Sequence, residues 1–438
     1  MLTKQPLHHS LPKFVTLNGA DTFFVMLETN NDPSKKGNNV IRMCLTCSTH
    51  ADAHFVEHKL KSSSIVHWLC NIQLINSKRL FFKPKWKYVD ERKNIVIHSH
   101  DANVEDEIPV EVLNRPLIIA NNEFISCDRI LYPSGKVVIV LSWHHALMDG
   151  RGSGFFIRSL LKEEDNVGFA FPEPEREPGF YHYVRNMYKV KRFIQHSSRF
   201  PIGAVRKWND SDSNRVAESK LYSHTFSPEQ TKKIDERALE SGAKFGSTNF
   251  LLACCAIAVH RLRREKGVNG DLWIPVPYDG RKRGGLGPII SNQIAFLFYR
   301  LSDENLDSVN DCTRLIHEQM MHQLKMDIPK KYDLLLRMMR YIPIWLYRYL
   351  TTNSSEGRVA SFLFSSAGQD KWDLSNLTSS NIEKIQLIPP ATVPPGLTFN
   401  FLRNNNCLTL NLLWSTAVLD QSEMEELKEV LLQLLAGE

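Results

Sequence analysis

A strongly apolar strand that ends in two histidines constrains this chain more than any other feature. Residues 136–143 are mostly β-branched and apolar, and polar and apolar positions do not alternate. Such a run predicts a buried central strand that is covered on both faces. His144 and His145 follow it directly, and Asp149 and Gly150 come four and five positions after the second histidine. The strand therefore provides a rigid mount for residues that can carry chemistry.

The second histidine has the properties of a general base. An imidazole titrates near neutral pH, so it can take a proton from an alcohol or an amine and later return it. Asp149 could orient the imidazole, as in a catalytic triad, or stabilise the turn through an ion pair. Gly150 permits a positive φ and a close approach of the backbone. The alternative interpretation is a pair of core histidines in front of a helix, with no catalytic role.

The composition is that of an ordinary folded protein with two domains. Of 438 residues, 42% are hydrophobic and 23% are charged, which excludes a disordered chain. One hydrophobic core rarely serves a chain of this length, so we expect two domains, at residues 1–205 and 206–438. The boundary lies in a segment, residues 164–220, whose proline-rich start and Asn/Asp/Ser-rich end bracket a basic, aromatic stretch.

Helical and strand patterns are mixed along both halves, which predicts an α/β (α+β) fold. Ser227 and Asp420 each begin a capping box and therefore mark helix starts. The predicted helices are residues 51–69, 153–162, 228–240, 248–264 and the segment after 420. The predicted strands are the stretch from 116 towards 131 and residues 136–143, 272–277, 293–301, 361–365, 398–402 and 408–414.

The eight cysteines are scattered through apolar segments, as expected for reduced, packed thiols of a cytoplasmic protein. Cys44 and Cys47 have the spacing of a zinc-binding pair, but residues 40–45 have the pattern of a strand. A strand would place the two sulfur atoms on opposite faces, so we expect no metal site there. The longest apolar run, residues 250–259, is too short to span a bilayer, and the N-terminal residues have no apolar leader.

The basic segments of the chain each have two possible interpretations. Residues 83–87 and 189–192 are rich in lysine and arginine in a chain of net charge +6. They are either a solvated face or a landing site for a phosphate-bearing donor or an anionic membrane surface. Residues 333–349 are apolar, aromatic and basic, with Pro343 as a break. They are either two packed helices or a surface for peripheral membrane contact. No motif for nucleic acid is present.

The segment His-His-x-x-x-Asp-Gly resembles the motif of the CoA-dependent acyltransferase superfamily. This superfamily includes chloramphenicol acetyltransferase, plant alcohol acyltransferases, condensation domains of peptide synthetases, and wax ester synthase/diacylglycerol acyltransferases. Weaker likeness to its members is found at residues 19–24, 116–130, 226–229, 246–249, 277–281, 291–292 and 365–368.

The resemblance implies a fold and a site. The fold would be two chloramphenicol acetyltransferase-like lobes that form a pseudo-dimer with a tunnel between them. An acyl thioester and an acceptor would enter the tunnel from opposite faces and meet at His145, the general base. His144, Asp149 and Gly150 would be the other catalytic residues. Asp149 would pair with Arg281 from the other lobe, because a buried carboxylate without a partner costs several kcal/mol. Asn292 would support the site.

The same resemblance implies the chemistry and the partners. The backbone N–H of Gly150 and the hydroxyl of Ser365 are candidate donors to the oxyanion of the tetrahedral intermediate. The reaction would use acyl-CoA or an acyl-carrier protein as co-substrate and an alcohol or amine as acceptor, with no metal or redox cofactor.

The chain departs from two branches of the superfamily. It lacks the Asp-Phe-Gly-Trp-Gly segment of the plant enzymes and the Ser-x-Ala-Gln opening of condensation domains. We therefore favour a stand-alone acyltransferase that acts on an alcohol. The alternatives are a stand-alone, amide-forming condensation-type domain and a non-catalytic descendant that binds a carrier protein or a lipid.

Overall fold

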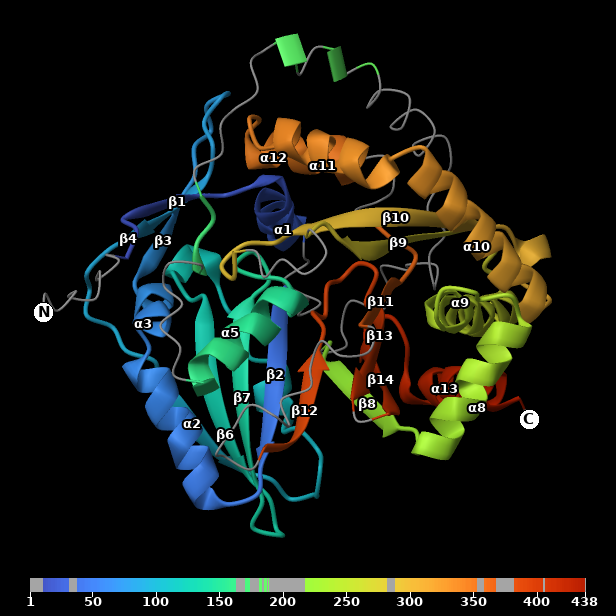
Figure 1. Cartoon of the computed structure of the whole chain (residues 1–438), viewed down its shortest axis with the longest axis horizontal. Helices are drawn as coiled ribbons and strands as arrows, with labels where there is room; N and C mark the ends of the chain where they lie inside the picture. The colour runs from blue at the N-terminus through green and yellow to red at the C-terminus, as the bar shows by residue number, and fades with distance from the viewer. Residues whose placement is uncertain are drawn as a thin grey trace, which may run out of the picture.

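The computed structural model has a mixed α/β fold in which the described strands form four sheets (Figure 1). The structure describes residues 11–30, 38–162, 170–173, 217–281, 288–352, 358–367, 382–404 and 406–437, and residues 181, 182, 185, 186 and 188. In Figure 1 the first half of the chain lies on the left and most of the second half on the right. The predicted α/β class is therefore confirmed. The domain boundary near residue 205 lies outside the described residues.

The predicted central strand is the middle of a five-stranded sheet. It is β7, Val137–His144, and every one of its residues is buried. It pairs antiparallel with β2 on one side and β6 on the other. The sheet order is β12 (Ile382–Ile388), β2 (Val40–Cys47), β7, β6 (Ile125–Leu131) and β5 (Ile97–Asp101). Since β12 comes from the second half of the chain, that half completes the sheet that carries the histidines.

The second half has a sheet and a helical layer of its own. The sheet order is β11 (Leu363–Ala367), β13 (Leu397–Asn404), β14 (Cys407–Ser415) and β8 (Ser219–Thr225), and β9 (Leu272–Asp279) and β10 (Ile294–Leu301) form a separate hairpin. The helices are α8 (Pro228–Glu240), α9 (Thr248–Glu265), α10 (Val309–Lys325) and α13 (Gln421–Ala436). Helix α9 is almost entirely buried and packs against α10 and α13.

The first helix of the chain connects the two halves. Helix α1 (Gly19–Asn30) packs against α11 (Ile328–Met339) and α12 (Ile344–Thr352). The approach is close, because a Cβ on Gly19 would lie 2.5 Å from the carbonyl carbon of Leu336. The other elements of the first half are β1 (Phe14–Thr16), α2 (His50–Ser62), α3 (Ser64–Cys70), β3 (Ile72–Ile75), β4 (Lys85–Tyr88), α4 (Val110–Leu113), η2 (Ile119–Asn121) and α5 (Gly150–Lys162). The short helix η4 is Asp303–Asn305.

Local capping signals predicted the starts of two helices correctly. The predicted helix 51–69 and the predicted strand from residue 116 need correction. Ser227 and Asp420 each form the predicted capping box, at the starts of α8 and α13. The predicted helix 51–69 is two helices, because Ser63 adopts an extended backbone and its side chain caps the second one. The extended stretch predicted from residue 116 is interrupted by η2, so its strand starts only at Ile125.

The cysteines lie where a packed, reduced thiol is expected. All eight are free, and six of them are buried. Cys44 and Cys47 are in β2 but belong to different core clusters, so they face opposite sides of the sheet. Burial raises the pKa of both thiols to about 12. Within the described residues, no helix is long and apolar enough to cross a membrane.

Candidate active site

Backbone hydrogen bonds hold the turn after β7 on both sides. The N–H of His144 donates to the carbonyl of Phe124 at 2.9 Å, and the N–H of His145 donates to the carbonyl of Asn39 at 2.8 Å. The N–H of Leu147 closes the turn on the carbonyl of His144 at 2.9 Å. The histidine pair is therefore part of the sheet edge and not of a free loop.

His144 shapes this turn. Its side chain is fully buried, and its Nδ1 accepts the N–H of Ala146 at 3.1 Å. An accepting Nδ1 places the ring proton on Nε2, which lies 3.4 Å from Oε2 of Glu28 on α1. His144 therefore bonds the turn through Nδ1, whereas its buried Nε2 approaches Glu28 without hydrogen-bonding geometry among the described residues.

The His145 imidazole lies against an aromatic ring of α1. It stacks on Phe24, with ring centroids 3.6 Å apart and an interplanar angle of 14°. Its Nδ1 is buried and has no partner in hydrogen-bonding geometry among the described residues, although its own backbone and Asn292 lie close enough to act on its pKa. Burial lowers the pKa of His145 to about 4, against the opposite effects of its backbone and of Asp149. The ring is therefore neutral at physiological pH and can accept a proton.

Asp149 is the most fully bonded residue of the motif. Its Oδ1 accepts the N–H of Gly152 at 2.7 Å, as the N-cap of α5 does. Its Oδ2 accepts Nη1 of Arg281 at 2.9 Å and the N–H of Gln293 at 2.8 Å. Two of these donors come from the second half of the chain. Asp149 therefore joins the turn to α5 and to the second half of the chain, which favours the structural interpretation over the triad.

Arg281 belongs to a cluster of opposite charges in which its side chain and that of Asp149 are buried and the other two members are partly exposed. Its side chain is 2% exposed, and its Nη1 lies 3.6 Å from Oδ1 of Asp279 in addition to Asp149. Arg151, on the first turn of α5, forms an ion pair with the same Asp279. Two arginines and two aspartates thus connect α5 to the end of β9.

Asn292 connects the carbonyl of the second histidine to a carboxylate that the sequence analysis gave no role. Its Nδ2 donates to the carbonyl of His145 at 2.9 Å and to Oδ1 of Asp21 at 3.0 Å. Its backbone N–H donates to the same oxygen at 2.7 Å. Asp21 also accepts the N–H of Asn18 at 2.9 Å, at the start of α1. Burial raises the pKa of Asp21 to about 7, against the lowering effect of these hydrogen bonds.

Gly150 does not have the backbone conformation that we expected. It begins α5 and is not among the glycines with positive φ. Its small size matters instead, since a Cβ would lie 3.1 Å from Cδ2 of Leu387 on β12. Gly152 is more tightly constrained, because a Cβ there would lie 2.8 Å from the carbonyl oxygen of Ile289. Ser365 lies on β11, where its hydroxyl accepts Nδ2 of Asn400 at 2.6 Å.

Sequence reasoning missed several residues around the histidine. They are Asn18, Asp21, Phe24 and Glu28 at or on α1, Asn39 before β2, Gly152 on α5 and Gln293 before β10. Two signals were usable: the spacing Asn18-x-x-Asp21, which is typical of a helix N-terminus, and the weak likeness at residues 19–24.

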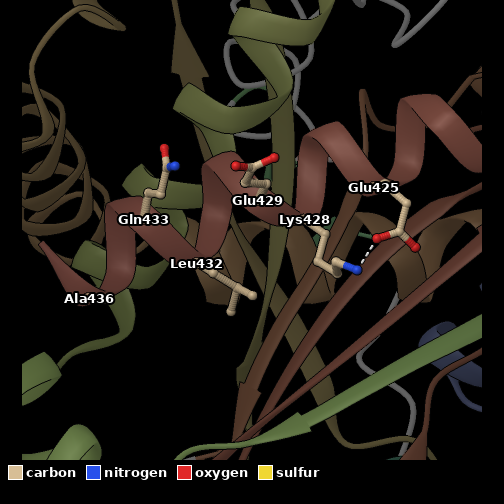
Figure 2. Close-up of a pocket in the computed structure, with 6 residues that line it drawn as sticks. All are labelled: Glu425, Lys428, Glu429, Leu432, Gln433 and Ala436. Atoms are coloured by element: carbon tan, nitrogen blue, oxygen red, sulfur yellow. Dashed lines mark hydrogen bonds and ion pairs between the residues drawn. The ribbon is translucent and has the colours of Figure 1, made fainter. Parts of the chain in front are cut away.

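A surface hollow lies elsewhere, along one face of α13 (Figure 2). Its lining residues are Glu425, Lys428, Glu429, Leu432, Gln433 and Ala436, and Lys428 forms an ion pair with Glu425. None of the residues around His145 takes part in it. We assign it no role in the site.

Solved structures share this fold over almost the entire chain. A trichothecene 15-O-acetyltransferase, TRI3, from Fusarium sporotrichioides is 13% identical, with 97% of this chain and 94% of that chain covered and a TM-score of 0.67. The first condensation domain of the CDA synthetase is 14% identical, with 97% and 95% covered and a TM-score of 0.64. The epimerization domain of the third module of tyrocidine synthetase B is 12% identical, with 97% and 95% covered and a TM-score of 0.59.

These likenesses define the class of fold. The chain shares the fold of an O-acetyltransferase, of condensation domains and of an epimerization domain, as the resemblance of the histidine motif predicted. No family model and no curated protein matches the sequence. Because the fold occurs in an acetyltransferase, a condensation domain and an epimerization domain, the reaction must be argued from the site.

Proposed function

We propose that this protein is an acyltransferase that moves an acyl group from a thioester to an alcohol, with His145 as the general base. The observation that supports this most is the imidazole itself. It is neutral, it is held by stacking on Phe24, and its backbone is bonded on both sides. Such a ring is fixed in position and still has the capacity to take a proton.

The reaction follows from the chemistry of a neutral imidazole. His145 removes the proton from the acceptor hydroxyl while the oxygen attacks the thioester carbonyl, and a C–O bond forms. The intermediate then collapses, the C–S bond breaks, and the thiolate takes the proton from the imidazolium. Negative charge on the intermediate raises the pKa of the adjacent imidazole, so proton transfer becomes favourable as the charge develops. The N–H of Gly150 and the hydroxyl of Ser365 are our proposed donors to this oxyanion.

The remaining residues act as the mount. Asp149, Arg281 and Asn292 fix the turn that carries the imidazole, through contacts at 2.8 to 3.0 Å with both halves of the chain. The scheme needs a thioester co-substrate, either acyl-CoA or an acyl-carrier protein, and no other cofactor. We place the meeting point of donor and acceptor at the predicted tunnel between the lobes.

The proposal has two versions, which differ in whether the acceptor of the acyl group is an alcohol or an amine. The neighbours include an O-acetyltransferase and condensation domains, so an amine is the alternative acceptor. The same general base serves both, because an alcohol and an amine each lose one proton on attack. A panel that offers alcohols and amines beside each other distinguishes ester formation from amide formation.

The central experiment measures thiol release from acyl-CoA and acyl-pantetheine thioesters in the presence of each acceptor. We expect His145→Ala to lower turnover by about 10²–10⁴-fold without loss of folding. His260→Ala is the matched control, since His260 is a buried histidine near a carboxylate, Asp303, but lies on α9 in the other core. Turnover that persists in the His145 variant would show that this imidazole is not the base. A wild-type protein that binds thioesters but turns none over would instead support the non-catalytic alternative.

A further inference from the structure

Two segments that are far apart in the sequence meet on one exposed face. The turn between β3 and β4 lies beside the junction of α11 and α12, at the upper end of the molecule in Figure 1. The N–H of Phe81 in that turn donates to the carbonyl of Tyr341 in that junction at 2.7 Å. We name this surface the basic aromatic face, and its residues are Lys78, Arg79, Leu80, Phe81, Trp345, Arg348 and Tyr349, all of them exposed.

The turn holds two large apolar side chains out of the protein. Leu80 and Phe81 are 55% and 80% exposed. Phe81 has a φ of 64°, a region that bulky L residues rarely adopt. Such a conformation persists only where the surroundings hold it, and here the hydrogen bond to Tyr341 does so. The turn therefore holds the backbone of Phe81 in a conformation that presents the phenyl ring to solvent.

Helix α12 adds a second row of exposed aromatic side chains. Trp345, Arg348 and Tyr349 are spaced by three and four residues, so they lie on one face of the helix. Trp345 and Tyr349 are 62% and 58% exposed, whereas Ile344 and Tyr347 on the opposite side are buried. Exposed apolar groups that gather in one place mark an interaction surface.

The charged residues that define the basic aromatic face are all positive. Lys78, Arg79 and Arg348 supply positive charge, and Lys85 lies 6.0 Å from the ring centroid of Phe82, the residue after Phe81. Residues 71–89 and 334–352 contain no aspartate or glutamate. A partner that fits here must therefore offer both negative charge and an apolar layer.

We propose that the basic aromatic face docks this protein onto an anionic lipid bilayer. Tryptophan and tyrosine prefer the headgroup region, and lysine and arginine are attracted to anionic headgroups. Helix α12 also packs on α1, which carries Phe24 against His145, so docking would orient the candidate site relative to the bilayer. The proposal does not rest on acyl transfer, because binding is measured without turnover.

Sedimentation with phosphatidylcholine vesicles, with and without phosphatidylserine, tests the proposal. We expect binding to the phosphatidylserine vesicles that weakens as salt is raised. Lys78→Glu combined with Arg79→Glu should weaken it by about tenfold or more. Phe81→Ser combined with Trp345→Ser should also weaken it and leave a residual, salt-sensitive attraction.

Matched controls come from exposed residues of the second half. Leu239→Ser combined with Phe245→Ser removes side chains that are 66% and 71% exposed, and Lys232→Glu combined with Lys233→Glu reverses two exposed charges. Both control proteins should bind as the wild type does. Absence of wild-type binding, or equal loss in the controls, overturns the proposal. A third result would also overturn the proposal: the protein does not bind vesicles, and charge reversal at Lys78 and Arg79 raises KM for a carrier-bound thioester. The face would then receive an acidic carrier protein and not a bilayer.

Discussion

The two ends of the turn after β7 are held in opposite ways. At its far end, both carboxylate oxygens of Asp149 accept hydrogen bonds, and two of the three donors come from the other half of the chain. At its near end, the His145 imidazole makes a ring contact with Phe24, and its Nδ1 has no partner in hydrogen-bonding geometry among the described residues. Asp149 is bonded through its side chain, and His145 through its backbone.

This difference indicates that Asp149 holds the turn in place and that His145 is the residue available for reaction. A side chain whose polar atoms are all engaged gives rigidity but has nothing to offer a substrate. A buried ring nitrogen without a hydrogen-bond partner, such as Nδ1 of the partly buried His145, costs folding free energy, and such groups are typical of functional sites. The comparison therefore predicts that the two residues fail differently when they are changed.

The largest effect on stability should come from Asp149→Ala. The substitution leaves the buried Arg281 guanidinium without its closest partner, which typically costs about 3–5 kcal/mol in unfolding free energy. Urea denaturation measures this loss. Asp271→Ala is the control, because it breaks an ion pair with Arg300 in which both side chains are partly exposed, at 34% and 25%, and should cost about 1 kcal/mol or less. Equal costs in the two variants would show that the cross-lobe pair does not hold the turn.

An intermediate effect is expected for Asn292→Ala, which removes the side-chain hydrogen bonds to Asp21 and to the His145 carbonyl but keeps the backbone hydrogen bond to Asp21. We expect a loss of about 1–3 kcal/mol in stability. Turnover should also fall, since the carbonyl that fixes the histidine backbone loses its donor. Asn114→Ala is the control, because Asn114 likewise joins the two halves by side-chain hydrogen bonds, to Ser219, but away from the site. A lower kcat in both variants would mean that any loosening of the lobes affects turnover.

The parts of the fold that the sequence predicted are those with strong local signals. The β-branched run of β7 and the capping boxes at Ser227 and Asp420 each specify an element within a few residues. Helix α1 escaped prediction because its apolar residues form one continuous run, residues 23–27, all of them buried, so no amphipathic stripe is visible. The pairing of β12 with β2 is a long-range contact for which no local pattern exists.

The residues of the candidate site also fall into those that the sequence predicted and those that it did not. His145 and Asp149 were visible because they are close together in a motif, and Arg281 and Asn292 because the resemblance implied them. Phe24 and Asn39 contact the histidine from segments more than 100 residues earlier in the chain. Neither has a chemistry that sequence reasoning would single out, since a phenylalanine and a backbone carbonyl occur everywhere. Their role follows only from the packing of α1 and β2 against the end of β7.

The smallest effect is expected for Asp149→Asn, and it is measured as a change in the pH dependence of kcat/KM relative to the wild type. With a His145 pKa of about 4, wild-type kcat/KM should stay flat as pH falls from 8 to about 5 and decline only as the imidazole becomes protonated near pH 4. A base with an ordinary histidine pKa would instead lose about tenfold per pH unit below about 6.5.

The negative charge of Asp149 raises the pKa of His145, so its removal should shift the acidic limb of the profile to lower pH. The expected change in kcat at pH 7 is small, because asparagine keeps the volume of the side chain and its oxygen can still accept the Gly152 or Gln293 N–H. If Asp149 instead oriented the imidazole as in a triad, the same substitution would lower kcat by about 10⁴-fold, through the wrong tautomer. A loss of that size would show that Asp149 acts in catalysis through the imidazole. The conclusion that Asp149 only holds the turn would then be wrong.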